Sequence, residues 1–145
     1  MAEPIILEVS RHIHAAPERV FDAWLDPDQV GLWLFATPEG VMEKVEIDPR
    51  VGGRFLIVER RAGEAAEHFG EYLEIDRPRK LIFTFAAMRD SGFTRVTVTI
   101  AAEGEGSRLV LVHEMDPVWA EYEDRTREGW TKILDGLAHT LATAA

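Results

Sequence analysis

The sequence predicts an α+β protein in which one antiparallel sheet is covered by a long C-terminal helix. Three observations predict it. From residue 41 to residue 115, apolar side chains recur at every second position between compact turns, which is typical of an antiparallel meander. Two short helical segments, each opened by a proline, come before that region. Beyond residue 116, apolar side chains fall mostly three or four residues apart, as on one face of a helix.

The N-terminal part contains one strand and two short helices. Ile5–Ile13 alternates apolar and polar residues and predicts the first strand. Pro17 suits the first position of a helix that carries Phe21 and Trp24 on its inner face. Asp26-Pro27 repeats this start signal, so we expect a second short helix that ends at about Leu34.

Six further strands and the last helix follow. The last helix begins at Asp116-Pro117 and runs for about 25 residues. Ser107 is expected in the turn before the final strand. The element order is therefore β-α-α-β-β-β-β-β-β-α. The six strands are predicted at Val41–Ile47, Arg54–Arg61, Glu67–Ile75, Lys80–Ala87, Phe93–Ala102 and Arg108–Met115.

Composition limits the function. The chain has 145 residues, with 26 acidic and 16 basic side chains and a net charge of −10, which argues against binding a phosphate backbone. The lack of cysteine excludes disulfides, thiol catalysis and cysteine-based zinc sites. No apolar run approaches the ~20 residues that span a bilayer, and the start shows no signal peptide. We expect one cytoplasmic domain over residues 1–145, without a membrane span or a nucleic-acid partner.

Four segments in a fixed order carry a family resemblance. They are IHAAPERVFDAW at 13–24, DPRVGGRF at 48–55, GEYLEI at 70–75 followed by PRKL at 78–81, and Gly129-Trp130 followed by Leu134 and Leu137. With them, the sequence resembles the START-like (SRPBCC) superfamily, in the branch of the activator of heat-shock-protein ATPase. The resemblance implies a helix-grip fold, in which a curved antiparallel sheet wraps around the C-terminal helix and leaves a cavity between them.

The search for a catalytic or metal centre is negative. Gly52-Gly53 lacks the spacing of a phosphate loop. The pair predicts a turn between strands, in which the glycines adopt a positive φ or let a helix approach closely. His12 and His14 share one side of a strand, but a zinc site needs a third ligand. No serine lies in a nucleophile elbow. We therefore assign no catalytic residue, no metal and no cofactor.

Two polar side chains are candidates for the interior. His113 and Glu114 lie on opposite faces at the end of the last strand, and an inward His113 would orient a ligand, act as an acid or base, or bond to a tyrosine or the backbone. Glu59 has the same parity as Phe55 and Ile57. A cavity-facing carboxylate with a raised pKa is one interpretation of Glu59, and a solvated strand end is the favoured one.

Aromatic residues complete the predicted lining of the cavity. Binding cavities are mostly apolar with a few placed polar groups, and this residue mix matches that description, although it also matches a filled core. The predicted ligand-binding residues are Trp33, Phe55, Ile57, Glu59, Tyr72, Phe85, His113, Met115, Tyr122, Trp130 and Leu134.

Three functions are compatible with this pattern. The leading hypothesis is binding of a small hydrophobic or amphipathic molecule between the sheet and the C-terminal helix. The resemblance implies a second one, a co-chaperone-like domain that stimulates a heat-shock ATPase in a stress response, although such activators carry a further N-terminal domain that we do not expect here. A third is a pocket enzyme of the cyclase, dehydratase or hydrolase type that uses His113 or a carboxylate. Either a monomer or a homodimer is expected, because sheet edges can pair.

Overall fold

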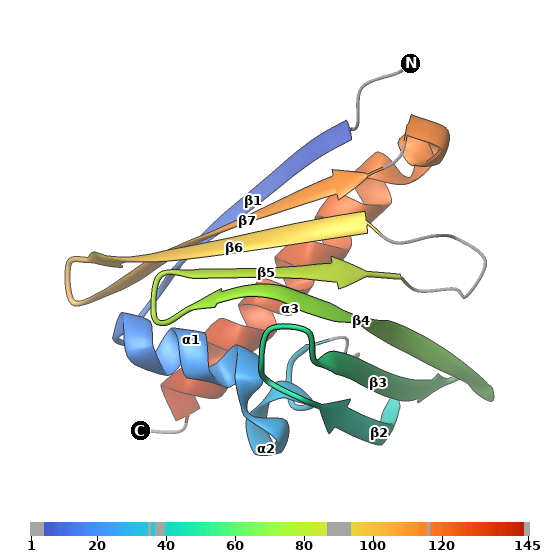
Figure 1. Ribbon diagram of the computed structural model, residues 1–145, viewed down its shortest axis with the longest axis horizontal. Coiled ribbons are helices and arrows are strands. Elements are labelled where there is room, and N and C mark those ends of the chain that lie inside the picture. The colour runs from blue at the N-terminus through green and yellow to red at the C-terminus, as the bar shows by residue number, and fades with distance from the viewer. Residues whose placement is uncertain (1–4, 35, 37–39, 87–93, 116, 144–145) are drawn as a thin grey trace.

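The computed structural model describes residues 5–34, 36, 40–86, 94–115 and 117–143, without the side chains of residues 118, 119, 142 and 143. The described strands form one antiparallel sheet in the order β1-β7-β6-β5-β4-β3-β2 (Figure 1). The strands are β1 (Ile5–Ile13), β2 (Val41–Ile47), β3 (Arg54–Arg61), β4 (Glu64–Asp76), β5 (Lys80–Phe85), β6 (Thr94–Glu103) and β7 (Gly106–Met115). The helices are α1 (Pro17–Leu25), α2 (Pro27–Val30), the 3₁₀ helix η1 (Pro117–Tyr122) and α3 (Glu123–Thr143).

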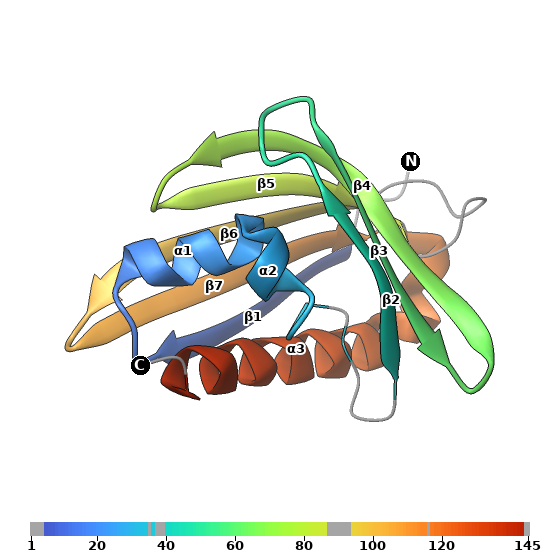
Figure 2. The same ribbon diagram turned by 90° about the horizontal axis from the view of Figure 1, so that it is seen from below.

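The sheet curves around α3, and α1 and α2 lie across one end of its concave face (Figure 2). The apolar face of α3 is buried against the sheet at helical spacing, through Trp130, Leu134, Leu137 and Leu141. On the sheet, Val96, Val98 and Ile100 of β6 are buried in the same way. Each fully buried side chain of this size contributes about 1.5–3 kcal/mol, so α3 and the sheet depend on each other for stability. The predicted α+β architecture and element order are confirmed.

Several boundaries agree with the sequence, and others shift. β1, β2 and β3 span the predicted residues, and β4 is longer because its hairpin with β3 closes tightly at Ala62-Gly63. Ala87 and Phe93, the predicted ends of two strands, lie outside the described residues. At the other turn, Gly52 has φ +87 and a Cβ on Gly53 would overlap the carbonyl of Asp48, which confirms the structural role of this glycine pair.

The predicted single C-terminal helix is wrong at its start. Residues Pro117–Tyr122 form the 3₁₀ helix η1, and the α-helix begins only at Glu123. Tight 3₁₀ turns are common at helix N-termini, and the acidic pair Glu123-Asp124 then occupies the first turn of α3, where carboxylates interact favourably with the helix dipole.

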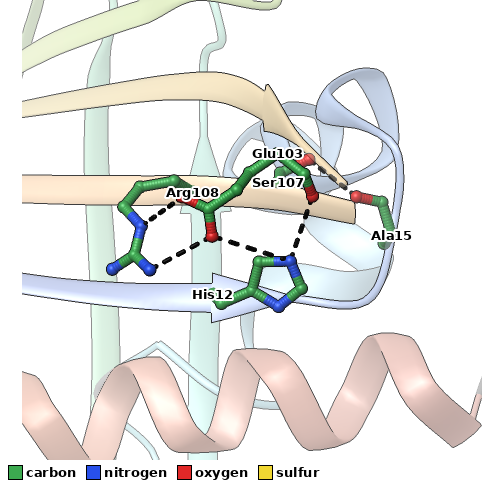
Figure 3. A network of polar contacts seen from close by, with 5 residues as sticks. All are labelled: His12, Ala15, Glu103, Ser107 and Arg108. Carbon is green, nitrogen blue, oxygen red and sulfur yellow. Dashed lines mark hydrogen bonds and ion pairs between the residues drawn. The ribbon is translucent and has the colours of Figure 1, made fainter. Parts of the chain in front are cut away.

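The predicted position of Ser107 in a turn is also wrong. Ser107 lies in β7, is fully buried, and donates its hydroxyl to the carbonyl of Ala15 over 2.7 Å (Figure 3). The preceding Gly106 permits this, because a Cβ there would overlap the carbonyl of Ile13. Beside Ser107, Arg108 donates its Nε–H to the carboxylate of Glu103 over 2.8 Å. The main-chain oxygen of Glu103 accepts a hydrogen bond from His12 (Figure 3). These contacts join β1, β6 and β7 at one end of the sheet.

Candidate ligand-binding site on the concave face

Polar groups gather at one end of the apolar concave face. Among the described residues, the buried polar or charged side chains are Glu59, His68, His113 and Ser107. The pairing of Ile57 with His68 and of Glu59 with Ala66 places Glu59 and His68 on the same face of β3 and β4. The ring of Phe85 lies between the two histidines, stacked on His68 at 6.1 Å and 5.8 Å from His113. We call Glu59, Arg61, His68, Phe85 and His113 the polar end.

Glu59 is almost completely buried, with 1% of its surface exposed, so the favoured interpretation of a solvated strand end is wrong. Arg61 donates its Nε–H to Oε1 of Glu59 over 2.5 Å. Gly40 covers the carboxylate from the other side, since a Cβ on Gly40 would overlap it. Strand parity predicted which way Glu59 points, but the segment that covers it comes from elsewhere in the chain. The result is a buried ion pair whose cation reaches the surface.

His113 connects α3 to the sheet through a chain of hydrogen bonds. Its Nδ1 accepts from Nε1 of Trp130 over 3.0 Å, which places the proton of the neutral imidazole on Nε2. Nε2 then donates to Oγ1 of Thr94 over 2.7 Å, and Thr94 donates to the carbonyl of Phe85 over 3.0 Å. Burial lowers the pKa of His113 to about 4. The partners are a tryptophan and a threonine, so His113 fixes the geometry of the interior with both nitrogens.

His68 is also buried and neutral near pH 7. Its Nδ1 lies 3.3 Å from the carbonyl of Ile57. Burial, with a smaller contribution from the positive charge of Arg61, lowers the pKa of His68 to about 4. Near neutral pH the two imidazoles of the polar end are therefore uncharged, and its described ion pair is that of Arg61 with Glu59.

The remaining predicted lining residues lie in three places: near the polar end, towards α1 and α2, and on the surface. Trp130 contacts Phe85 at 6.0 Å and His113 at 5.9 Å, and Ile57, Met115 and Leu134 are buried. Towards α1 and α2, Phe55 lies 5.7 Å from Tyr72, whose pKa is raised by burial, and Trp33 packs edge-on against Trp24 at 4.6 Å.

Tyr122 is exposed, with the guanidinium of Arg125 5.6 Å from its ring centre. The structure thus brings Glu59, Ile57, Phe85, His113 and Trp130 to one end.

The described interior is filled beside α1 and α2. A cavity of about 10 Å³ there is lined by Trp24, Leu34, Phe55, Tyr72, Leu81 and Phe83 and has room for one water at most. A larger groove of about 620 Å³ lies over Leu56 and Phe69, which alternate with the inward residues of β3 and β4 and so lie on the outer face of the sheet. No cluster of three side chains suited to a metal ion occurs among the described residues.

Sequence reasoning missed Arg61, His68 and Thr94. The alternation of faces along a strand could have indicated each of them. Arg61 lies on the same face as Glu59, and His68 on the same face as Tyr72. Thr94 lies on the same face as Val96. These parities indicate the face of a strand but not which polar groups meet across it. The outer groove had no signal in the sequence.

An antiparallel sheet closed around a C-terminal helix, with polar groups at one end of an apolar concave face, defines a protein of the helix-grip class. The chain belongs to the Activator of Hsp90 ATPase homolog 1-like family, whose model matches residues 14–142. The match confirms the START-like resemblance. No curated protein matches the chain. No helix among the described residues is long and apolar enough to cross a membrane.

Solved structures share this fold along nearly the whole chain. A protein from Chromobacterium violaceum is 29% identical, with a TM-score of 0.83, and the match covers 94% of this chain and 96% of that one. An AHSA1-like protein from Aeromonas hydrophila is 25% identical, with a TM-score of 0.83 over 97% and 94% of the two chains. A protein from Rhodobacter sphaeroides is 24% identical, with a TM-score of 0.86 over 97% and 93%, and supports the fold alone.

Proposed function

We propose that the protein binds a small hydrophobic or amphipathic molecule at the polar end of the concave face, between the sheet and α3. The observation that carries this proposal is the buried carboxylate of Glu59, paired with Arg61, in a mostly apolar interior. A buried ion pair is often no more stabilising than apolar side chains of the same volume. Stability alone therefore gives no reason for this pair, whereas polar recognition inside an apolar site does.

The surroundings of Glu59 suit such a molecule. Ile57, Phe85 and Trp130 offer apolar surface to its body, and Glu59, Arg61 and His68 offer hydrogen bonds to its polar group. The site lies away from the filled region beside Trp24, at the end of the sheet where β5 ends and β6 begins. Of the other predicted residues, Met115 and Leu134 would support this wall, and Trp33, Phe55 and Tyr72 would close the opposite end. Tyr122 would lie at the rim.

Because His113 binds Trp130 and Thr94 with its two nitrogens, it has a positioning role in this proposal and no acid–base role. The pocket-enzyme hypothesis loses its leading base for that reason. The prediction of one cytoplasmic domain over residues 1–145, as a monomer or homodimer, is retained as part of the proposal.

The binding proposal is tested with the neutral fluorescent probe N-phenyl-1-naphthylamine. Ala66 pairs with Glu59 on the concave face, whereas the neighbouring Ala65 is exposed on the outer face. We expect saturable binding of one probe, lost in Ala66→Phe and kept in the matched control Ala65→Phe. A signal kept in Ala66→Phe and lost in Leu56→Gln would place the probe in the outer groove and contradict the proposal, as would the absence of saturable binding.

The family match favours a second candidate function, stimulation of a heat-shock ATPase. It is tested by measuring the ATPase rate of an Hsp90-type chaperone with and without the protein. A rate that rises with protein concentration supports this candidate, and an unchanged rate contradicts it. If Ala66→Phe stimulates as well as the wild type, the interaction is independent of the polar end.

A further inference from the structure

The outer groove crosses β3 and β4, which are neighbours in the sheet, on the face that the proposed function does not use (Figure 1). Its apolar part contains Leu56 and Phe69, which pair directly across the two strands and are both half-buried. Two residues away on each strand, on the same face, lie Arg54 and Glu71, which are also direct partners and also line the groove. The volume of about 620 Å³ is within the range of small-molecule sites, about 300–1,000 Å³.

The charged groups of Arg54 and Glu71 are not paired with each other. Directly opposed residues of antiparallel strands have Cβ atoms about 4.5–5.5 Å apart, which is close enough for such side chains to meet. Within the described part of the chain, no hydrogen bond or ion pair includes the guanidinium of Arg54 or the carboxylate of Glu71. Glu46, the other charged residue at the groove, lies 3.9 Å from Nζ of Lys44. The groove therefore offers one cation and one anion to a ligand.

The main chain beside these charges is held in place. The N–H of Glu71 donates to Oγ1 of Thr84 in β5 over 2.9 Å, and Thr84 also lines the groove. Leu56 and Phe69 are fixed by the pairing of β3 with β4. Two opposite charges and an apolar surface thus lie on one rigid part of the sheet, which is the support that a binding site needs.

This arrangement matches the chemistry of a free amino acid. An α-amino acid carries an ammonium and a carboxylate on one carbon, and its side chain leaves from the same carbon. Its carboxylate would bind the guanidinium of Arg54, whose fork suits a planar carboxylate, and its ammonium would bind the carboxylate of Glu71. An apolar side chain would then lie over Leu56 and Phe69 and leave water. A ligand with a single charge would use only one of the two charged groups.

We propose that the outer groove binds a free α-amino acid with an apolar side chain. Arg54 and Glu71 hold its charged end, and Leu56 and Phe69 hold its side chain. This inference goes beyond the proposed function and does not depend on it, because the groove and the polar end lie on opposite faces of the sheet.

The test is a titration of ¹⁵N-labelled protein at pH 7.5, followed through the main-chain amide resonances of Leu56, Phe69 and Gly70. L-leucine is compared with three relatives: 4-methylpentanoate lacks the ammonium, 3-methylbutylamine lacks the carboxylate, and N-acetyl-L-leucinamide lacks both charges. Exposed ion pairs contribute little each, because water screens them, so we expect L-leucine to bind about threefold or more tightly than each relative. Glycine, which keeps both charges but has no apolar side chain, should also bind more weakly than L-leucine.

Two variants separate the two charges. In Arg54→Gln the affinity for L-leucine should fall to the wild-type value for 3-methylbutylamine, and in Glu71→Gln it should fall to the wild-type value for 4-methylpentanoate. General damage to the fold would not produce this reciprocal pattern. Arg60→Gln is the matched control, because Arg60 lies on the same face of β3 but pairs with Glu43 over 2.7 Å, and this variant should keep the wild-type affinities.

Saturable binding with this order of affinities supports the inference. Equal binding of L-leucine and N-acetyl-L-leucinamide would overturn it, because the charges would then have no part in recognition. Binding of L-leucine that is lost in Ala66→Phe but kept in Leu56→Gln would place the amino acid on the concave face and would also overturn it. Absence of saturable L-leucine binding contradicts this inference alone, whereas absence of N-phenyl-1-naphthylamine binding contradicts the proposed function alone.

Discussion

Trp130 of α3 donates its indole Nε1–H to Nδ1 of His113 in β7, over 3.0 Å, inside an otherwise apolar interface. The bond continues through Thr94 of β6 to the main-chain oxygen of Phe85 in β5. A polar chain thus runs from the helix across three strands. Apolar packing alone tolerates small shifts of a helix along a sheet, whereas this chain is complete in only one position of α3. It fixes the helix beside the candidate site.

The first prediction concerns this bond. Trp130→Phe keeps an aromatic ring but leaves Nδ1 of His113 without its donor, and we expect the free energy of unfolding to fall by about 1–3 kcal/mol. Trp130→Ala also removes the packing and should cost about 3–5 kcal/mol. Urea denaturation measures both. Equal stability of Trp130→Phe and wild type would mean that the bond does not hold α3 in place.

The second prediction is a loss of stability in mild acid. An unfolded histidine binds a proton near pH 6.5, whereas His68 and His113 do so in the folded protein only near pH 4, because burial lowers the pKa of each. Between these values the unfolded state binds more protons, so stability is complete above pH 6.5 and falls as the pH drops towards 4. Each histidine contributes roughly 3 kcal/mol to this loss.

Urea denaturation at several pH values from 8 to 4.5 checks this dependence. His68→Gln and His113→Gln should each flatten the curve below pH 6.5. The stabilisation from the ion pair of Asp22 with Arg77 is lost only at lower pH, because Arg77 lowers the pKa of Asp22 from 3.8. A wild-type curve that is level from pH 7 to 4.5 would rule out buried, neutral histidines.

The third prediction tests the cover over Glu59. A Cβ on Gly40 would overlap the Glu59 carboxylate, which Arg61 holds in place. Gly40→Ala should therefore be destabilising, and much less so in a Glu59→Ala background, where the space is vacant. The double-mutant cycle should give a coupling of about 0.5–3 kcal/mol. Additive effects would place Gly40 away from Glu59.

The fourth prediction concerns the hairpin between β3 and β4. Ala62 has φ +50 and is followed by Gly63 with φ +85, and such turns favour asparagine or glycine at the first position. Ala62→Asn should raise the stability by about 0.5–1 kcal/mol. Gly63→Ala should lower it by about 1 kcal/mol. Thermal unfolding measures both changes, and a destabilising Ala62→Asn would contradict the positive φ.

Periodicity predicted the architecture because each strand and helix reports locally which of its faces is buried. Val96 and Val98 on β6, and Trp130 and Leu134 on α3, lie where their spacing placed them. Local pattern does not contain contacts between distant segments. The segment Gly104-Glu105-Gly106 before Ser107 predicts a turn, yet the Ser107 hydroxyl is buried against Ala15, 92 residues away in the chain.

The candidate site shows the same limit. The alternation of side chains along β3 predicts the direction of Glu59. Its burial depends on Gly40, which follows α2 in the chain, and on the hydrogen bond from Arg61. The inward direction of His113 was one of the open alternatives, and its partners Trp130 and Thr94 come from two other elements. Such hydrogen-bond partners depend on the register of the strands and on the position of the helix on the sheet. The spacing of residues along the chain does not predict either of these.

The most direct test of the central claim is a titration of ¹⁵N-labelled protein with 1-decanol, followed through the indole N–H resonances of its 4 tryptophans. Trp130→Phe identifies the resonance of Trp130 by its disappearance. Because Trp130 borders the polar end, its resonance should move saturably as 1-decanol binds, while that of Trp24, in α1, should move little. A Trp130 resonance that stays in place at saturating 1-decanol would contradict a ligand site at the polar end of the concave face.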